Sequence, residues 1–157
     1  RIDPDFLHVG KNDLPCIYRP GLMMRLIVGA AYGRSSPVRT FSPMFYLDVL
    51  ADKGSQLEHP ARDQEAAICI ISGALEISGK RYEKGDFVLL DSDDTSFTAL
   101  ENCRYVIIGG KRFERIPHIH WNFVAYERAT IDEARQRWDA GEFPAIPGDD
   151  EEHIPLP

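Results

Sequence analysis

The sequence lacks the features that define several large classes of protein. No stretch of its 157 residues approaches the roughly 18 uninterrupted apolar residues that a membrane-spanning helix requires. Cysteine is scarce, and the three cysteines form no CxxC pair, which argues against a disulfide framework or a zinc site. No P-loop, dinucleotide-binding glycine cluster or Ser-His-Asp arrangement is present. We therefore expect a cytoplasmic protein with no membrane span.

Basic residues are absent from the C-terminal end. All 18 Lys and Arg lie at or before Arg137, whereas residues 138–157 carry six carboxylates of a chain whose formal net charge is −7. The rest of the chain is nearly neutral, so it lacks the excess of Lys and Arg that binding to phosphate backbones requires. We expect no direct nucleic-acid binding. The acidic end is interpreted as a solvated, solubilising segment, with an electrostatic docking arm as the alternative.

An initiating Met and a signal-peptide pattern are also missing, because the chain opens with Arg-Ile-Asp-Pro. We interpret the chain as a piece of a longer protein. Residues 1–20 are mixed and rich in turn residues, and they are predicted to form a linker or an edge segment.

Short apolar segments separated by turn residues make up most of the remaining chain. With 12 Gly and 11 Pro, the composition favours many short elements joined by turns. The predicted strands are 22–29, 45–50, 66–71, 74–77, 87–90, 95–100 and 104–108. Strands at this regular spacing are typical of an all-β sandwich or barrel. We assign residues 21–126 to this β domain.

One helix is predicted in residues 127–157, followed by an acidic tail that ends in proline. Thr130 is a suitable N-cap, and Glu133 three residues later completes a capping box. Gly141 is placed to end the helix in the left-handed conformation.

The glycines between residues 54 and 100 resemble the two motifs of the cupin superfamily, whose members are small β-barrels of the jelly-roll type. Gly54 and Gly73 fit the two ends of the first motif with the correct spacing, and Gly85 opens the second. The four positions at which cupins carry metal ligands are occupied here by Pro60, Arg62, Ala66 and Ser96.

These four residues are poor or impossible ligands. Pro and Ala carry no donor atom, and Arg stays protonated and repels a cation. We predict a cupin domain without a metal. His59, Glu58 and Glu65 each lie one position from a ligand slot, but a slip of one residue would turn the neighbouring strand side chains to the other face.

His118 and His120 form a second possible ligand pair, because residues two apart on a strand face the same way. No carboxylate or third His nearby completes a set. Two surface or edge histidines are the favoured interpretation.

Segments outside the barrel motifs are similar to the C-terminal half of the pirin family, in particular to its bacterial branch. These segments are 24–30, 46–49, 121–124 and 138–148, together with Gly33, the Ser36-Pro37-Val38 run and the Gly109-Gly110 pair. The resemblance implies a two-cupin protein of which this chain is the second barrel. It also implies a single iron held in the first barrel, and an intact protein with iron-dependent quercetin 2,3-dioxygenase activity or a regulatory role. No residue that carries the dioxygenase chemistry has a counterpart here.

Three hypotheses for function follow. In the first, the chain is a metal-free, structural and interaction domain that packs against an iron-binding N-terminal cupin, and the isolated domain self-associates through the surface left open. In the second, the barrel binds or transforms a small aromatic or anionic ligand without metal, in a pocket formed by Arg62, Ser96, Thr98, Ile68 and Ile70. In the third, the acidic tail docks other proteins.

Overall fold

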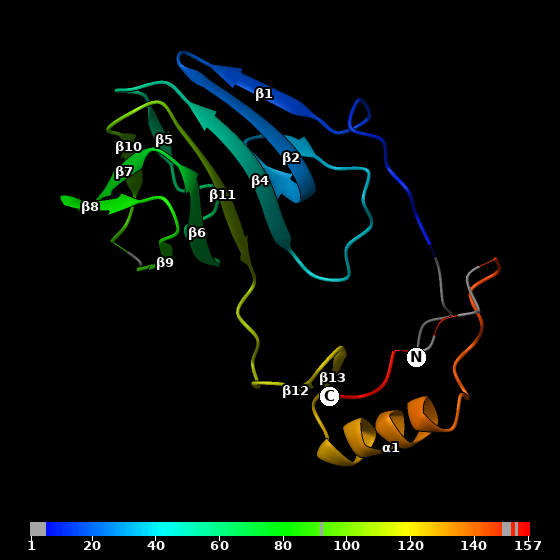
Figure 1. The fold of residues 1–157 in the computed structure, drawn as a ribbon. Coiled ribbons are helices and arrows are strands. Elements are labelled where there is room, and N and C mark those ends of the chain that lie inside the picture. Colours follow the sequence, from blue (N-terminus) through cyan, green and yellow to red (C-terminus); the bar gives the residue numbers. More distant parts are fainter. Residues whose placement is uncertain (1–5, 92, 149–151, 153) are drawn as a thin grey trace. The chain divides into compact units, whose positions relative to one another are not determined.

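The computed structural model describes residues 6–91, 93–148, 152 and 154–157. The chain divides into two compact units, Arg1–Arg112 and Phe113–Pro157 (Figure 1). The domain boundaries expected after residues 20 and 126 stay predictions. Three of the six carboxylates of the acidic end, at residues 149–151, lie outside the described part. No helix in that part is long and apolar enough to cross a membrane.

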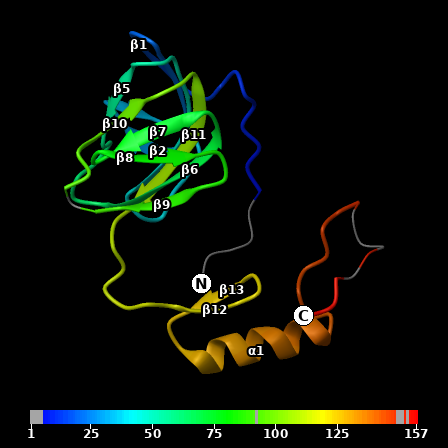
Figure 2. The same ribbon diagram turned by 60° about the vertical axis from the view of Figure 1, so that its left-hand side comes forward.

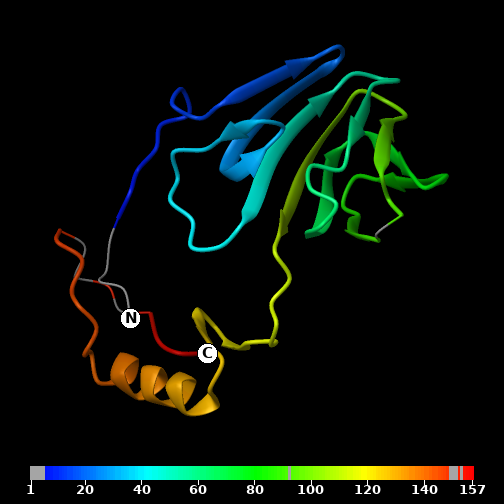
Figure 3. The same cartoon turned by 180° about the vertical axis from the view of Figure 1, so that it is seen from behind.

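The first unit consists of two antiparallel sheets. The larger sheet has the order β1-β2-β4-β11-β6-β9, and β3 pairs with β2. Its strands are β1 (Cys16–Arg19), β2 (Leu22–Ala31), β3 (Arg34–Ser35), β4 (Met44–Ala51), β6 (Glu65–Ser72), β9 (Phe87–Leu90) and β11 (Cys103–Gly110). The long strands β2, β4 and β11 lie side by side in Figure 3.

The smaller sheet has the order β5-β10-β7-β8. Its strands are β5 (Gln56–Glu58), β7 (Ala74–Ile77), β8 (Lys80–Glu83) and β10 (Ser96–Ala99). Figure 2 shows it as a second layer over the larger sheet. Two facing sheets confirm the predicted cupin-type, all-β fold, and each of the seven predicted strands is present.

Alternation of side chains along the strands builds the core between the sheets. In β4, Phe45, Leu47 and Val49 are buried while the residues between them face outward. Large side chains such as Tyr105 and Phe97 fill the interior, and they are almost completely shielded from solvent. The space between the sheets is therefore a packed apolar core.

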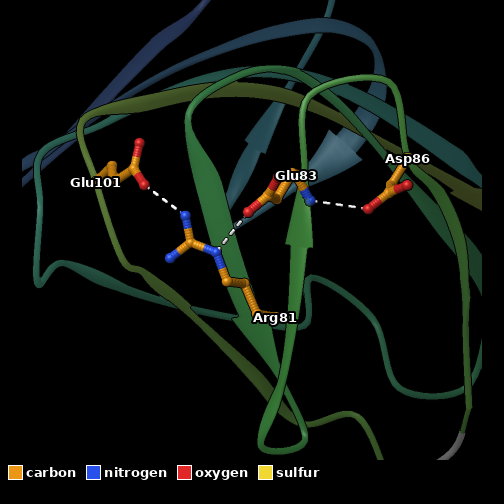
Figure 4. A network of polar contacts seen from close by, with 4 residues as sticks. All are labelled: Arg81, Glu83, Asp86 and Glu101. Carbon is orange, nitrogen blue, oxygen red and sulfur yellow. Dashed lines mark hydrogen bonds and ion pairs between the residues drawn. The ribbon is translucent and has the colours of Figure 1, made fainter.

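A polar network fixes the outer hairpin of the smaller sheet. The β7–β8 turn uses Ser78 and Gly79 in the left-handed region, as a two-residue hairpin turn requires. Arg81 pairs with both Glu83 and Glu101, and the Glu83 backbone N–H donates to Asp86 over 2.8 Å (Figure 4). These groups are exposed, so they position the hairpin more than they stabilise the fold.

The second unit contains a hairpin and a helix. The hairpin pairs β12 (His118–His120) with β13 (Phe123–Ala125), and α1 spans Arg128–Asp139. The predicted N-cap is wrong, because the helix starts two residues before Thr130, with Glu127 at the N-cap and no side-chain capping bond. The predicted stop is confirmed, since Gly141 has a φ of 68° and its N–H donates to the Trp138 carbonyl.

An aromatic cluster holds this second unit together. Trp138 of α1 lies with its ring centroid 5.1 Å from that of Trp121 and 5.6 Å from that of Phe143, and Phe123 stacks on Phe143. The indole N–H of Trp138 donates to the Ile154 carbonyl over 2.8 Å. The hairpin, the helix and the end of the tail are thus connected by side chains of one small core.

Candidate functional site

One inward-facing row of residues occupies the region where the first cupin motif would place its carboxylate ligand. In register across four strands of the larger sheet, this inner row consists of Phe45, Gly109, Ala66 and Leu90. A Cβ atom on Gly109 would lie 2.3 Å from Cζ of Phe45, so the phenyl ring packs directly on the Gly109 backbone. Small residues at positions 66 and 109 therefore make room for an aromatic ring.

The other three motif positions do not face this interior together. Pro60 and Arg62 lie in the loop after β5, where Pro60 is half-buried and Arg62 is exposed. Ser96 is exposed on β10, where Phe97 and Ala99 take the inward places. The structure thus brings only Ala66 of the four into the core.

The sequence-predicted pocket is only partly assembled. Ile68 and Ile70 of β6 are buried as expected. That pocket would require Ser96 and Thr98 to point inward, but strand alternation gives the inward places of β10 to Phe97 and Ala99. Thr98 instead accepts a 3.3 Å hydrogen bond from the Gln56 side chain. A role of these residues and Arg62 in ligand binding stays a prediction.

His59 lies at the mouth of the sandwich. Its ring meets that of Phe45 edge-on, with centroids 6.3 Å apart, and is tilted against Phe97 at 6.4 Å. Its Nδ1 accepts the backbone N–H of Ala61 over 3.1 Å. Strand alternation argued against a ligand role for His59, but β5 ends at Glu58, so alternation does not govern position 59.

A cleft of about 290 Å³ opens beside His59. We call it the mouth cleft; it is lined by His59, Arg62, Asp63, Gln64, Glu65, Leu90, Asp91 and Arg112. Arg112 is already engaged with Glu65, at 3.3 Å between Nε and Oε1. Of the lining residues, only Arg62, His59 and Glu65 could be identified from the motif positions in the sequence. The remainder come from three separate loops and strand ends, which no local motif connects.

Burial lowers the pKa of His59 below its ordinary value of 6.5, and the nearby Arg62 guanidinium lowers it further, against the opposing effect of Asp94 and Asp63. The ring is therefore neutral at pH 7. Because Nδ1 accepts a hydrogen bond, the ring hydrogen resides on Nε2.

We predict that the His59 Cε1 proton titrates below pH 6.5 in an NMR pH series on the folded protein, and that Arg62→Gln moves the midpoint upward by removing a like charge. The stability contribution has a definite sign. Since the folded pKa is the lower one, the unfolded chain takes up the proton first, and stability is lost as the pH falls through 6.5 toward the folded pKa. A midpoint at or above 6.5 would contradict the burial of this ring.

The histidine pair of the second unit lies on β12. His118 is exposed, whereas His120 is half-buried and its Nε2 atom is buried without a hydrogen-bond partner in the described part of the chain. Among the described residues, no group of three or more His, Cys, Asp or Glu side chains could hold a metal ion.

The outer face of the larger sheet is unusually apolar for a surface. One row runs in register across five strands and consists of Val28, Tyr46, Ile108, Ala67 and Leu89. The next row carries Arg25, Asp48, Val106, Cys69 and Phe87, and Asp48 accepts two hydrogen bonds from Arg104. We call these two rows the outer apolar face. Leu89 is 74% exposed and Phe87 59% exposed, so the face lies open at the β9 edge.

Comparison with known proteins identifies relatives over nearly the whole chain. Residues 46–144 match the family model of the pirin C-terminal cupin domain. A pirin-like protein of Caulobacter vibrioides is 35% identical over 99% of this chain and 54% of its own length, and pirin of Rattus norvegicus is 27% identical over 85% and 48%.

A solved structure is similar to this chain over most of its length. The crystal structure of quercetin 2,3-dioxygenase from Acinetobacter baumannii superposes with a TM-score of 0.79 at 26% identity, covering 92% of this chain and 50% of that one. The chain thus spans about half the length of the relatives that it matches. The family match extends over more than half of the chain, which therefore belongs to the pirin family as a C-terminal cupin domain.

Proposed function

We propose that this cupin is a metal-free, non-catalytic domain that packs against an iron-binding N-terminal cupin of the same protein. The observation that carries the proposal is the inner row, in which a phenyl ring lies over Gly109 beside the alanine that replaces the motif's carboxylate. A site filled by an aromatic ring offers a cation neither donor atoms nor space.

The outer apolar face supports the packing role. Leu89 and Phe87 are largely exposed and Tyr46 and Ile108 partly so, and in the isolated domain this apolar area contacts water. Removing it from water favours association by about 25 cal/mol per Å² of apolar area. A second cupin domain is the partner we assign to it, since the relatives are about twice as long as this chain.

For the intact protein, we propose that any oxidative chemistry belongs to the N-terminal cupin. The Acinetobacter relative is named as a quercetin 2,3-dioxygenase, which makes a flavonol dioxygenase the first activity to test. In this arrangement the present domain contributes stability and a surface for regulatory partners.

Elemental analysis tests the metal-free state. The chain, purified without tag or chelator, is expected to hold less than a tenth of an equivalent of iron, manganese, copper, nickel or zinc, because the motif positions carry Pro60, Arg62, Ala66 and Ser96. Near one equivalent retained through dialysis would contradict the proposal. His59, Glu65 and the His118/His120 pair would then be the residues to replace.

A further inference from the structure

The mouth cleft contains two hydrogen-bond donors that the fold itself does not use. Among the described residues, none forms a hydrogen bond or ion pair with the Arg62 guanidinium. The hydrogen bond of the His59 ring is the one that its Nδ1 atom accepts from the Ala61 N–H. The Nε2–H of the neutral imidazole is therefore available as a donor. A positive group and a neutral donor line the same cleft.

One apolar side chain lines the cleft beside these donors. Leu90 reaches it from the β9 end of the inner row, and the His59 ring, packed on the buried Phe45 and Phe97, lines it as well. Pockets for small ligands combine apolar contact area with a few placed polar groups. Leu90 and the His59 ring offer a contact area that suits one small ring.

The acidic groups of the cleft limit the charge of a ligand. Asp63, Asp91 and Glu65 line it together with Arg62 and Arg112, and Arg112 is already paired with Glu65. Asp94, which also acts on His59, accepts from Ser78 and from the Asp91 N–H. A guanidinium that no described residue pairs with, set among several carboxylates, can stabilise a single negative charge, but a multiply charged anion would meet repulsion.

We propose that the mouth cleft binds a small monocarboxylate with an apolar, ring-like body, its carboxylate held between the Arg62 guanidinium and the His59 Nε2–H. Arg and carboxylate form strong, charge-assisted hydrogen bonds. The ring of the ligand contacts Leu90 at the mouth of the sandwich. This site uses no metal, and it is independent of the packing role of the outer apolar face.

Titration of the full chain with benzoate at pH 7.5, followed by amide NMR shifts, tests the proposal. Benzoate is expected to shift the amides of residues 61–63 and 90–91 with a Kd on the order of millimolar, as befits a ligand of this size. Benzamide, which has the same shape without the charge, and inorganic phosphate are each expected to bind at least tenfold more weakly.

Variants test whether Arg62 and His59 hold the carboxylate of benzoate. Arg62→Gln is expected to weaken benzoate at least tenfold, and since Arg62 is exposed the fold is retained. His59→Phe keeps an aromatic ring but removes the donor, and is expected to weaken benzoate as well. Arg34→Gln, at an exposed arginine of β3 outside the cleft, is the control and is expected to change nothing.

Three results would overturn the proposal. They are the absence of cleft shifts at tens of millimolar benzoate, an unchanged Kd in Arg62→Gln, and phosphate binding as tight as that of benzoate. The last would mean non-specific attraction of anions to an exposed arginine. None of these results bears on metal content or on association through the outer apolar face.

Discussion

Replacing Gly109 with alanine is expected to cost about 3 kcal/mol of the free energy of unfolding, at the upper end of overpacking effects. The added Cβ would lie 2.3 Å from Cζ of Phe45 and 2.6 Å from the Glu65 carbonyl oxygen, so both a ring and a backbone would have to move. Urea unfolding followed by far-UV circular dichroism measures the loss. Tryptophan fluorescence is unsuitable because Trp121 and Trp138 both lie in the second unit.

The neighbouring glycine provides a matched control. A Cβ on Gly110 would approach the Pro43 carbonyl oxygen only to 3.2 Å, so Gly110→Ala is expected to cost much less. Combining Gly109→Ala with Phe45→Leu removes part of the clash, and the double variant should be more stable than the sum of the single losses predicts. Equal losses for Gly109→Ala and Gly110→Ala would contradict the packing of Phe45 on residue 109.

The fold could be predicted from the sequence because its signals are local. Apolar runs such as 66–71 and 104–108 lie between turn residues, and these runs are β6 and β11 in the structure. The strands that were missed carry weak signals. β8 reads Lys-Arg-Tyr-Glu and is exposed, and β5 has only three residues with one buried side chain. Their places are set by pairing with β7 and β10, which is tertiary information.

The site was predictable only in part. The spacing of the glycines located the motif positions and indicated that their residues make poor ligands. It could not predict that Phe45, more than sixty residues earlier in the chain but paired with Gly109 in the sheet, packs over Gly109. The motif spacing also gave β10 the wrong orientation, because it placed Ser96 and Thr98 inward. The alternation of polar and apolar residues in Ser96–Ala99 favours Phe97 and Ala99 on the buried face, which is what the structure shows.

A charge at the edge of the outer apolar face is expected to abolish self-association. Leu89 is 74% exposed on β9, which lies at the end of the larger sheet, so Leu89→Asp should leave the isolated fold intact. In an associated state the same aspartate would be desolvated without a partner, which is strongly unfavourable. In a symmetric dimer the substitution occurs in both subunits, so its unfavourable effect on the free energy of association is doubled. We therefore expect the dissociation constant to rise at least about a hundredfold.

A control separates this face from general surface hydrophobicity. Phe41 lies in the loop between β3 and β4 and is 71% exposed, nearly as much as Leu89, but it belongs to neither row of the outer apolar face. Phe41→Asp introduces the same charge and is expected to leave association unchanged. An equal effect of the two variants would mean that association is non-specific.

Sedimentation velocity of the isolated chain across a concentration series tests the packing role most directly. We expect concentration-dependent association of the wild type in the micromolar range, absent at these concentrations in Leu89→Asp and retained in Phe41→Asp. We propose that the outer apolar face packs against a second cupin domain. If the wild type remains strictly monomeric at the highest concentration reached, this proposal is contradicted.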